Sequence, residues 1–137
     1  MGSIHPSEAQ LAELMEGDDS GPVTMINLLR YRDDAEYPAG SEATACSGRE
    51  AYQRYGGQVT PLIEKAGAHV VWAGSVVAAA IAPDGEAWHD AILVQYPTRA
   101  AFIEMVSAPV YQAAAVHRTA ALLDSRLIAT RGAVVES

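Results

Sequence analysis

Several residue types are scarce in this chain, and each scarcity excludes a class of protein. The 137 residues include one cysteine, so neither an internal disulfide nor a cysteine-rich zinc site can form. Lysine occurs once, acidic residues outnumber basic ones 17 to 9, and the arginines are scattered. A phosphate backbone requires a basic stripe, and an anionic membrane surface requires basic clusters. We therefore expect neither a nucleic-acid nor a membrane partner.

Long hydrophobic runs and nucleotide-binding motifs are also missing. The longest uncharged apolar stretch, Val70 to Ala82, is shorter than the roughly 20 residues of a membrane-spanning helix. No basic region followed by an apolar one opens the chain, so the cytoplasm is the expected compartment. Neither a GxxxxGKS/T loop nor a GxSxG elbow occurs, which argues against nucleotide cofactors and acyl-enzyme chemistry. No cofactor is expected.

Half of the residues are apolar and only 19% are charged, a composition that can bury a core. We expect one domain over 1–137, with a peripheral helix in 1–20, a folded core over 21–132 and a tail over 133–137. The acidic stretch from Arg32 to Gly48 indicates a long surface loop within this domain. We expect its cysteine to be an inert thiol.

Apolar spacing predicts the first elements of the core. Val23–Tyr31 is almost continuously apolar, which is typical of a strand covered on both faces. Residues 49–66 carry apolar side chains at intervals of three and four, which predicts a helix. Ser47 is available to cap this helix and Gly67 to end it, and a bend is expected at Pro61.

The second half of the chain continues with two predicted strands, His69–Ala82 and Trp88–Tyr96. The turn sequence Pro83-Asp84-Gly85 joins them into a hairpin. A helix interrupted at Pro109 follows, and a final strand is predicted over Ser125–Arg131.

The resulting order of elements predicts an α+β fold of the ferredoxin-like βαββαβ type, a four-stranded antiparallel sheet with helices on one face. Adjacent strand residues point to opposite faces, yet runs such as Ile92-Leu93-Val94 are apolar at every position. The second face of the sheet therefore needs a cover, and a second copy of the sheet is the simplest one. We expect a homodimer.

Seven ordered blocks carry a resemblance to a known family. They are Met25-Ile26-Asn27-Leu28-Leu29-Arg30-Tyr31, Ala51-Tyr52-Gln53-Arg54-Tyr55, Lys65-Ala66-Gly67-Ala68, Trp72-Ala73-Gly74, Tyr96-Pro97-Thr98-Arg99-Ala100-Ala101-Phe102, Pro109-Val110-Tyr111-Gln112 and His117-Arg118-Thr119-Ala120. Over roughly Val23 to Arg131 the chain resembles the domain-of-unknown-function family 1330. The resemblance implies the dimeric α/β-barrel superfamily, in which two ferredoxin-like protomers press their sheets together into a barrel.

Relatives in that superfamily include cofactor-free monooxygenases, isomerases, polyketide cyclases and haem-degrading enzymes. In many of them a pocket lies between the sheet and the helices of each protomer. The resemblance therefore implies where a ligand would bind, and it leaves the reaction open.

Polar residues in apolar surroundings are the first site candidates. Asn27 lies inside an apolar strand, so its amide must be satisfied, either by a bound carbonyl or phenol or by neighbouring backbone. His117 can act as a general base, and Arg118 or Tyr111 can stabilise an oxyanion. The alternative is that Arg118 pairs with Asp124 and that His117 packs among alanines.

Aromatic residues are the second group. Tyr52 and Tyr55 lie on the apolar stripe of the predicted helix, where they either fill the core or contact a ligand. Trp72 and Gly74 share a strand face, and a glycine beneath two tyrosines leaves room for a flat ligand.

The remaining histidines show no metal-binding pattern. His69 and the pair His89-Asp90 can meet across the hairpin or lie on its rim. A metal site needs three or four converging ligands, and no His lies two or four positions from another His or Glu on one helix. No metal site is expected.

These observations predict a homodimer whose protomers each bind a small apolar or aromatic molecule between sheet and helices. A cofactor-independent proton transfer, cyclisation or oxidation would use His117, Arg118 and Asn27. The alternatives are a non-catalytic binding or sensing module, and haem binding or breakdown by superfamily analogy. The residues expected to contact the molecule are Trp72, Gly74, Tyr52, Tyr55 and Tyr111.

Overall fold

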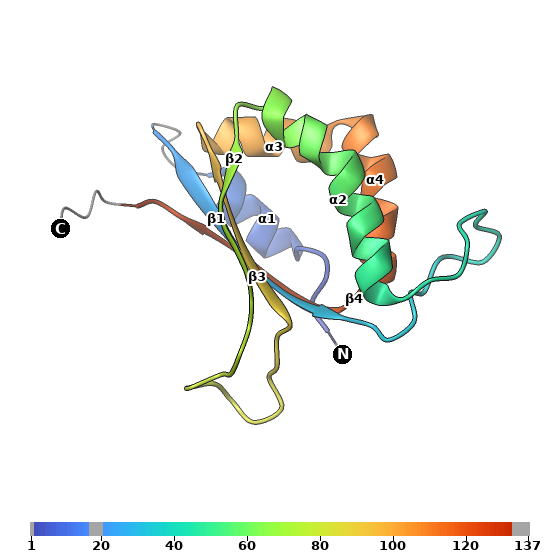
Figure 1. Ribbon diagram of the computed structural model, residues 1–137. Helices are drawn as coiled ribbons and strands as arrows, with labels where there is room; N and C mark the ends of the chain where they lie inside the picture. The colour runs from blue at the N-terminus through green and yellow to red at the C-terminus, as the bar shows by residue number, and fades with distance from the viewer. Residues whose placement is uncertain (1, 17–20, 133–137) are drawn as a thin grey trace.

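The computed structural model describes residues 2–16 and 21–132, so the predicted tail lies outside the described residues. Four strands form one antiparallel sheet in the order β2-β3-β1-β4. Figure 1 shows the helices on one side of this sheet and no helix on the other. The predicted ferredoxin-like α+β arrangement is confirmed. The elements are α1 (Glu8–Met15), β1 (Val23–Tyr31), α2 (Gly48–Lys65), β2 (His69–Ser75), β3 (Asp90–Tyr96), α3 (Arg99–Ser107), α4 (Pro109–Ala121) and β4 (Leu122–Thr130).

The strand register separates two faces of the sheet. Val23, Met25 and Leu29 are buried beneath the helices, and residues directly opposite each other in an antiparallel pair share a face. The helix-facing residues of the three strands β1, β3 and β4 are therefore Val23, Met25, Asn27, Leu29, Ile92, Val94, Tyr96, Ser125, Leu127 and Ala129. The opposite, open face carries Thr24, Ile26, Leu28, Arg30, Trp72, Gly74, Ala91, Leu93, Gln95, Arg126, Ile128 and Thr130.

The ends of α2 are determined by local sequence, as predicted. Ser47 and Glu50 form a capping box at its start, and Gly67, with φ of 79°, follows its end. Pro61 lies inside the helix and removes the donor that would bond the carbonyl four residues earlier. Figure 1 shows α2 curving in its C-terminal half, where the bend was expected.

Gly48 fixes where α2 begins. Its backbone N–H donates to the Arg32 carbonyl at 3.1 Å. A Cβ at this position would lie 2.2 Å from the Arg32 oxygen and 2.7 Å from the Ala121 oxygen. Only glycine permits this close approach, which holds the first turns of α2 against β1 and the end of α4.

The β2–β3 hairpin differs from its prediction. Both strands are shorter than the apolar runs that predicted them, because β2 ends at Ser75 and β3 begins at Asp90. The predicted turn is present at Gly85, whose φ is 82°. Val77 and Ile81 are each 98% exposed. The apolar segment that follows Ser75 extends beyond the end of the sheet, where no neighbouring strand pairs with it.

The remaining elements follow the predicted order with shifted ends. Ser7 caps α1 at its start. Pro109 separates α3 from α4, as predicted. β4 begins at Leu122, directly after α4 and earlier than the predicted Ser125.

The apolar core is divided into two clusters. One is formed by Val23, Met25, Tyr55, Val59, Ala68, Val94, Tyr96, Phe102, Met105 and Ala114, and the other by Leu29, Tyr31, Ala51, Ala121 and Leu122. Partly buried Tyr52 and Ile92 pack against both clusters. Asn27 follows Met25 and precedes Leu29 on the same face of β1, so a polar group lies between the two clusters.

Candidate functional site

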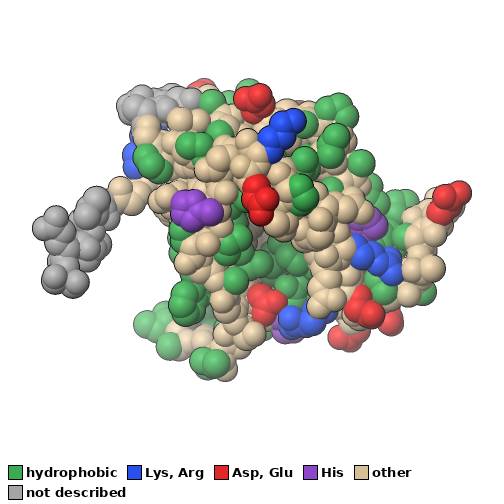
Figure 2. All heavy atoms as spheres, turned by 45° about the horizontal axis from the view of Figure 1, so that its top comes forward, with side chains coloured by type: hydrophobic (Ala, Val, Ile, Leu, Met, Phe, Trp, Pro, Cys, Tyr) green, Lys and Arg blue, Asp and Glu red, His purple; other side chains and the backbone are tan. Residues whose placement is uncertain are grey.

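A hollow of about 270 Å³ opens at the β2 edge of the sheet, beside the start of α2. Figure 2 looks into the space between the two layers, where hydrophobic side chains lie in the depth and acidic and basic ones lie at the lower rim. The residues that line the hollow are Arg49, Ala73, Gly74, Ser75, Asp90 and Ile92.

The rim of the hollow is a charge-compensated cluster. Arg49 donates to the Asp90 carboxylate at 3.0 Å, and the Tyr31 hydroxyl donates to the same oxygen at 2.7 Å. The Arg49 guanidinium lies 4.6 Å from the centre of the Tyr31 ring, and the His89 ring stacks on Tyr31. Burial and the Asp90 carboxylate raise the pKa of Tyr31, so its phenol stays protonated and keeps donating.

Two polar atoms lie between sheet and helices without a partner. Among the described residues nothing bonds the Tyr52 hydroxyl, and the Asn27 amide donates to the carbonyls of Ile92 (3.1 Å) and Met25 (3.4 Å) while its oxygen accepts nothing. Within the described ranges, Arg32 Nε is the one fully buried side-chain polar atom that lacks a partner. The other two atoms are therefore reached by solvent. Because Asn27 lies on the helix-facing side of a central strand, that solvent must enter between the layers.

Tyr52 is chemically distinct from its tyrosine neighbours. Burial raises the pKa of Tyr52 to about 12, and the positive charge of Arg118 acts in the opposite direction. The phenol is therefore neutral near pH 7 and can donate a hydrogen bond to a ligand oxygen. Tyr55 and Tyr111, in contrast, bond each other at 2.9 Å, and burial raises the pKa of Tyr55. Their hydroxyls belong to the core.

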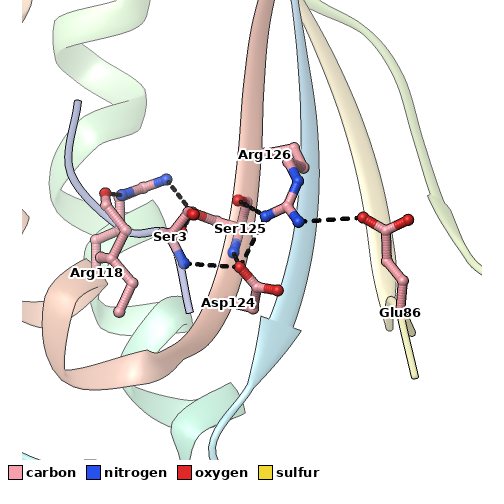
Figure 3. A network of polar contacts seen from close by, with 7 residues as sticks. Ser3, Glu86, Arg118, Asp124, Ser125 and Arg126 are labelled. Carbon is pink, nitrogen blue, oxygen red and sulfur yellow. Dashed lines mark hydrogen bonds and ion pairs between the residues drawn. The ribbon is translucent and has the colours of Figure 1, made fainter. Parts of the chain in front are cut away.

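Arg118 points from α4 towards the sheet and the N-terminal segment. Its guanidinium donates to the Ile4 carbonyl at 2.9 Å and to the Ser125 hydroxyl at 3.4 Å, as Figure 3 shows. Both partners are neutral. The ion pair with Asp124 that the sequence left open as an alternative does not form.

Asp124 is occupied by other donors. Its carboxylate accepts hydrogen bonds from the backbone N–H groups of Ser3 and Ser125, each at 2.8 Å, and pairs with Arg126 at 2.8 Å. Arg126 also pairs with Glu86 at 3.1 Å. These bonds lower the pKa of Asp124 although partial burial opposes them. The network ties the N-terminal segment and the hairpin to β4 (Figure 3).

His117 lies away from the hollow, on the side of α4 that meets α2 and the 32–47 loop. Its Nδ1 is 2.6 Å from the Tyr37 hydroxyl and its Nε2 is 3.2 Å from the Gln58 side-chain nitrogen. Arg54 also donates to the Tyr37 hydroxyl, at 3.2 Å. Burial and the Arg54 charge lower the pKa of His117. Both ring nitrogens have hydrogen-bond partners in this geometry.

Trp72 and Gly74 share a strand face, as predicted, but it is the open face of the sheet. Trp72 pairs with Leu93 and is 62% exposed. Its indole nitrogen lies 3.1 Å from where a Cβ on Gly74 would be. The sheet thus separates the Trp72 side chain from Tyr52 and Tyr55, and Gly74 reaches the hollow through its backbone at the edge strand.

The other histidines do not meet. His69 pairs with Gln95 at one end of the β2–β3 ladder, whereas His89 precedes β3 at the other end and accepts the Tyr31 N–H at 2.9 Å. Across residues 2–16 and 21–132, no group of three or more His, Cys, Asp or Glu side chains could hold a metal ion. No helix in the same ranges has both the length and the apolar character needed to cross a membrane.

The sequence did not identify the rim cluster of Tyr31, Arg49 and Asp90 or the contact between Tyr37 and His117. The strand register could have indicated the first, because Asp90 pairs with Leu29, two residues before Tyr31. That register depends on where the hairpin ends, which the apolar run obscured.

Comparison with known proteins identifies related chains but no activity. A family model described as "Domain of unknown function (DUF1330)" matches residues 42–132, so the block in β1 lies outside the matched region. A crystal structure of the RPA0582 protein of Rhodopseudomonas palustris, described as a protein of unknown function, is 38% identical with a TM-score of 0.90, and the match covers 98% of this chain and 100% of that one. The methylated RPA0582 protein is 40% identical with a TM-score of 0.89, and the match covers 97% of this chain and 96% of that one.

A more distant structure shares the fold alone. It is a dimeric protein of unknown function with a ferredoxin-like fold from Bacteroides fragilis, 15% identical with a TM-score of 0.51, matched over 84% of this chain and 100% of that one. No curated protein sequence matches this chain.

Proposed function

The chain belongs to the DUF1330 family, whose description assigns no activity, and we propose that it binds a small apolar or aromatic molecule between its sheet and its helices. One observation carries the proposal. The Tyr52 hydroxyl and the Asn27 amide oxygen lie between two core clusters, unpartnered among the described residues and in contact with solvent. Water that bonds these groups must enter an apolar layer, and a ligand with a matching acceptor and donor would replace that water.

The size of the hollow and the residues that line it indicate which class of ligand would fit. Its volume of about 270 Å³ is just below the roughly 300–1,000 Å³ typical of pockets for drug-sized ligands. Ile92 and Ala73 line the hollow and would supply apolar contact. Asn27 pairs with Ile92 across the sheet, and in the proposed complex Tyr52 and Asn27 would supply one donor and one acceptor. A single ring with one or two oxygen atoms matches this combination.

What Tyr52, Asn27 and Arg118 would supply to a cofactor-independent reaction is polarisation of a carbonyl group, because none of the three is a base that can take a proton near neutral pH. Tyr52, as a neutral phenol, would donate to a carbonyl oxygen of the substrate, and Asn27 would hold a second polar group. Arg118 would stabilise negative charge that develops on that oxygen. We assign His117, whose ring is held by Tyr37 and Gln58, to positioning α4 rather than to contact with substrate.

Binding of acetophenone, a neutral molecule with one ring and one oxygen atom, tests the proposal through chemical-shift changes in the protein's NMR spectrum. Ala73 lies at the exposed edge strand and lines the hollow, so Ala73→Phe should block entry and abolish most of these changes. Ala113→Phe on the exposed side of α4 is the matched control and should leave them in place. Equal binding to both variants would place the probe elsewhere and contradict the proposal. A ligand recovered unchanged after incubation would support a binding module over an enzyme.

We further propose that two copies pair through the open face of the sheet. That face carries Ile26, Leu28 and Leu93 at its centre, and Trp72 and Ile128 are 62% and 50% exposed in the single chain. Contiguous apolar surface of this kind is typical of an interface. The Bacteroides fragilis protein of the same fold is described as dimeric, which supports the pairing.

A further inference from the structure

Asp90 is the acidic residue that lines the hollow, and its two carboxylate oxygens have different surroundings. Oδ2 accepts hydrogen bonds from the Tyr31 hydroxyl at 2.7 Å and from the Arg49 guanidinium at 3.0 Å. No described residue donates to Oδ1, and Oδ1 is not one of the fully buried polar atoms that lack a partner. Solvent therefore reaches Oδ1, which is the acceptor that Asp90 can offer to a ligand.

The sheet residues that line the hollow form a polar end and an apolar end. Asp90 pairs with Ser75 across the strands, and Ile92 pairs with Ala73. Residues directly opposite each other share a face of the sheet, and all four line the hollow. Residues two apart on a strand are separated by roughly 7 Å. This span suits a single ring that rests on the apolar pair and carries one polar group at the edge nearer the polar pair.

The charge of Asp90 is already balanced within the hollow. Arg49 forms an ion pair with its carboxylate at 3.0 Å. A cationic ligand beside Oδ1 would be repelled by the guanidinium, and an anionic ligand would be repelled by the carboxylate. The partner that suits Oδ1 is therefore a neutral donor. A hydroxyl group meets this requirement, because it donates to a carboxylate in a short, charge-assisted hydrogen bond.

We propose that the hollow takes a neutral hydroxylated aromatic molecule, whose hydroxyl donates to Asp90 Oδ1 and whose ring lies on Ile92 and Ala73. The inference rests on the proposed function and names the chemical class of its ligand. The two donors to Oδ2, Tyr31 and Arg49, keep the carboxylate turned so that Oδ1 stays available.

Two derivatives of acetophenone test the inference. 4-Hydroxyacetophenone and 4-methoxyacetophenone carry the same added oxygen atom, and only the first can donate a hydrogen bond. NMR titration at about pH 6, below the range in which a phenol ionises, gives both affinities. We expect the hydroxylated probe to bind about tenfold or more tightly, because a hydrogen bond to a charged acceptor is the stronger kind. Affinities within about threefold of each other would overturn the inference.

Asp90→Asn keeps the shape of the side chain and changes its hydrogen bonding towards the hollow. Tyr31 and Arg49 both donate, so the amide oxygen would take the place of Oδ2 and the NH₂ group that of Oδ1. An NH₂ group can donate to the added oxygen of either probe, so the preference should disappear. Asp84→Asn, in the exposed turn between β2 and β3, removes the same charge elsewhere and should preserve the preference. A preference that survives Asp90→Asn would overturn the inference.

The outcomes separate the two proposals. A wild-type chain that binds acetophenone but does not distinguish its two derivatives upholds the proposed function and overturns the inference. A wild-type chain that binds none of the three overturns the proposed function itself. If Asp90→Asn does not fold, NMR cross-relaxation in the wild-type complex decides. The ring protons beside the probe's hydroxyl should contact the side chain of Ser75, which lies opposite Asp90, and contacts confined to other parts of the chain would overturn the inference.

Discussion

Each face of the sheet departs at its centre from the usual distribution of polar and apolar side chains. The face beneath the helices holds an amide, Asn27, at its centre, whereas the uncovered face holds Ile26, Leu28 and Leu93. A sheet with one solvated face normally places polar residues outside and apolar ones inside. Both departures carry our proposals: Asn27 on the covered face supports the proposed ligand site, and the apolar residues on the open face support the proposed pairing with a second copy.

Strand β1 carries both the amide on the covered face and two of the apolar residues on the open face. Side chains of β1 alternate between the faces, so Asn27 and its neighbours Ile26 and Leu28 are separated only by the thickness of the backbone. A partner on the open face would hold β1 rigid while the hollow on the other face remains accessible. Contact with solvent therefore has a different meaning on the two faces: it reaches polar groups without a protein partner on one and apolar surface on the other.

A carboxylate in the open face should produce the largest effect. Leu93 lies opposite Ile26 and Trp72, so Leu93→Asp would bury an unpaired charge in the proposed interface. Such a charge costs roughly 2–5 kcal/mol, which weakens the dimer by about 30-fold or more. Sedimentation equilibrium measures the change. Val110→Asp, at a 63% exposed site on α4, is the control and should leave the dimer intact. A wild-type chain that is monomeric at micromolar concentration would refute the pairing.

Two alanine substitutions in β1 compare how tightly the side chains are packed around Leu29 and around Asn27 on the helix-facing side of the sheet. Leu29 is fully buried, so Leu29→Ala should lower the free energy of unfolding by about 2–5 kcal/mol. Asn27→Ala removes hydrogen bonds of modest net value and should cost about 1 kcal/mol. Urea unfolding at a fixed chain concentration gives both values. Equal costs would mean that the space around Asn27 is packed as tightly as the cluster around Leu29.

The smallest effect concerns pH. The folded chain lowers the pKa of His117 from its ordinary value of 6.5, so between these two pKa values the unfolded chain binds more protons. The free energy of unfolding should therefore fall as pH drops from about 7.5 to about 5.5. His117→Asn should flatten this dependence in thermal melts, and His5→Asn in the exposed N-terminal segment should not. The lowered pKa of Asp124 acts at more acidic pH, below this window. An unchanged slope in His117→Asn would show that other groups carry the dependence.

The features predicted correctly from the sequence are those that depend on a few neighbouring residues. Ser47 caps α2, Gly67 ends it and Pro109 divides the last helices, because each acts through its own backbone geometry. The predicted β2 strand was too long because its apolar run continues past Ser75. Where a strand ends depends on whether a neighbouring strand is there to pair with it.

The candidate site was predictable in part. Asn27 was selected because a polar group inside an apolar strand needs partners, Tyr52 because it lies on the apolar stripe of a helix, and Arg118 because it can stabilise an oxyanion. In the structure Asn27 faces the helices, Tyr52 packs against both core clusters and Arg118 bonds Ser125 on β4. His117 is adjacent to Arg118 in sequence, but successive helix residues point about 100° apart. One side chain therefore turns to the sheet and the other to Tyr37. The sequence does not indicate which of the two side chains faces the sheet and which faces Tyr37.

The order of elements, their caps and the apolar runs of the strands follow from local backbone preferences and composition, and could be predicted from the residues alone. Three further facts come from the packing of the whole chain: Asn27 faces the helices, Arg118 bonds neutral partners and Trp72 lies on the open face. Those facts depend on strand register and helix rotation. A shift of one residue in register exchanges the two faces of a strand, and only the packing of the whole chain selects between them.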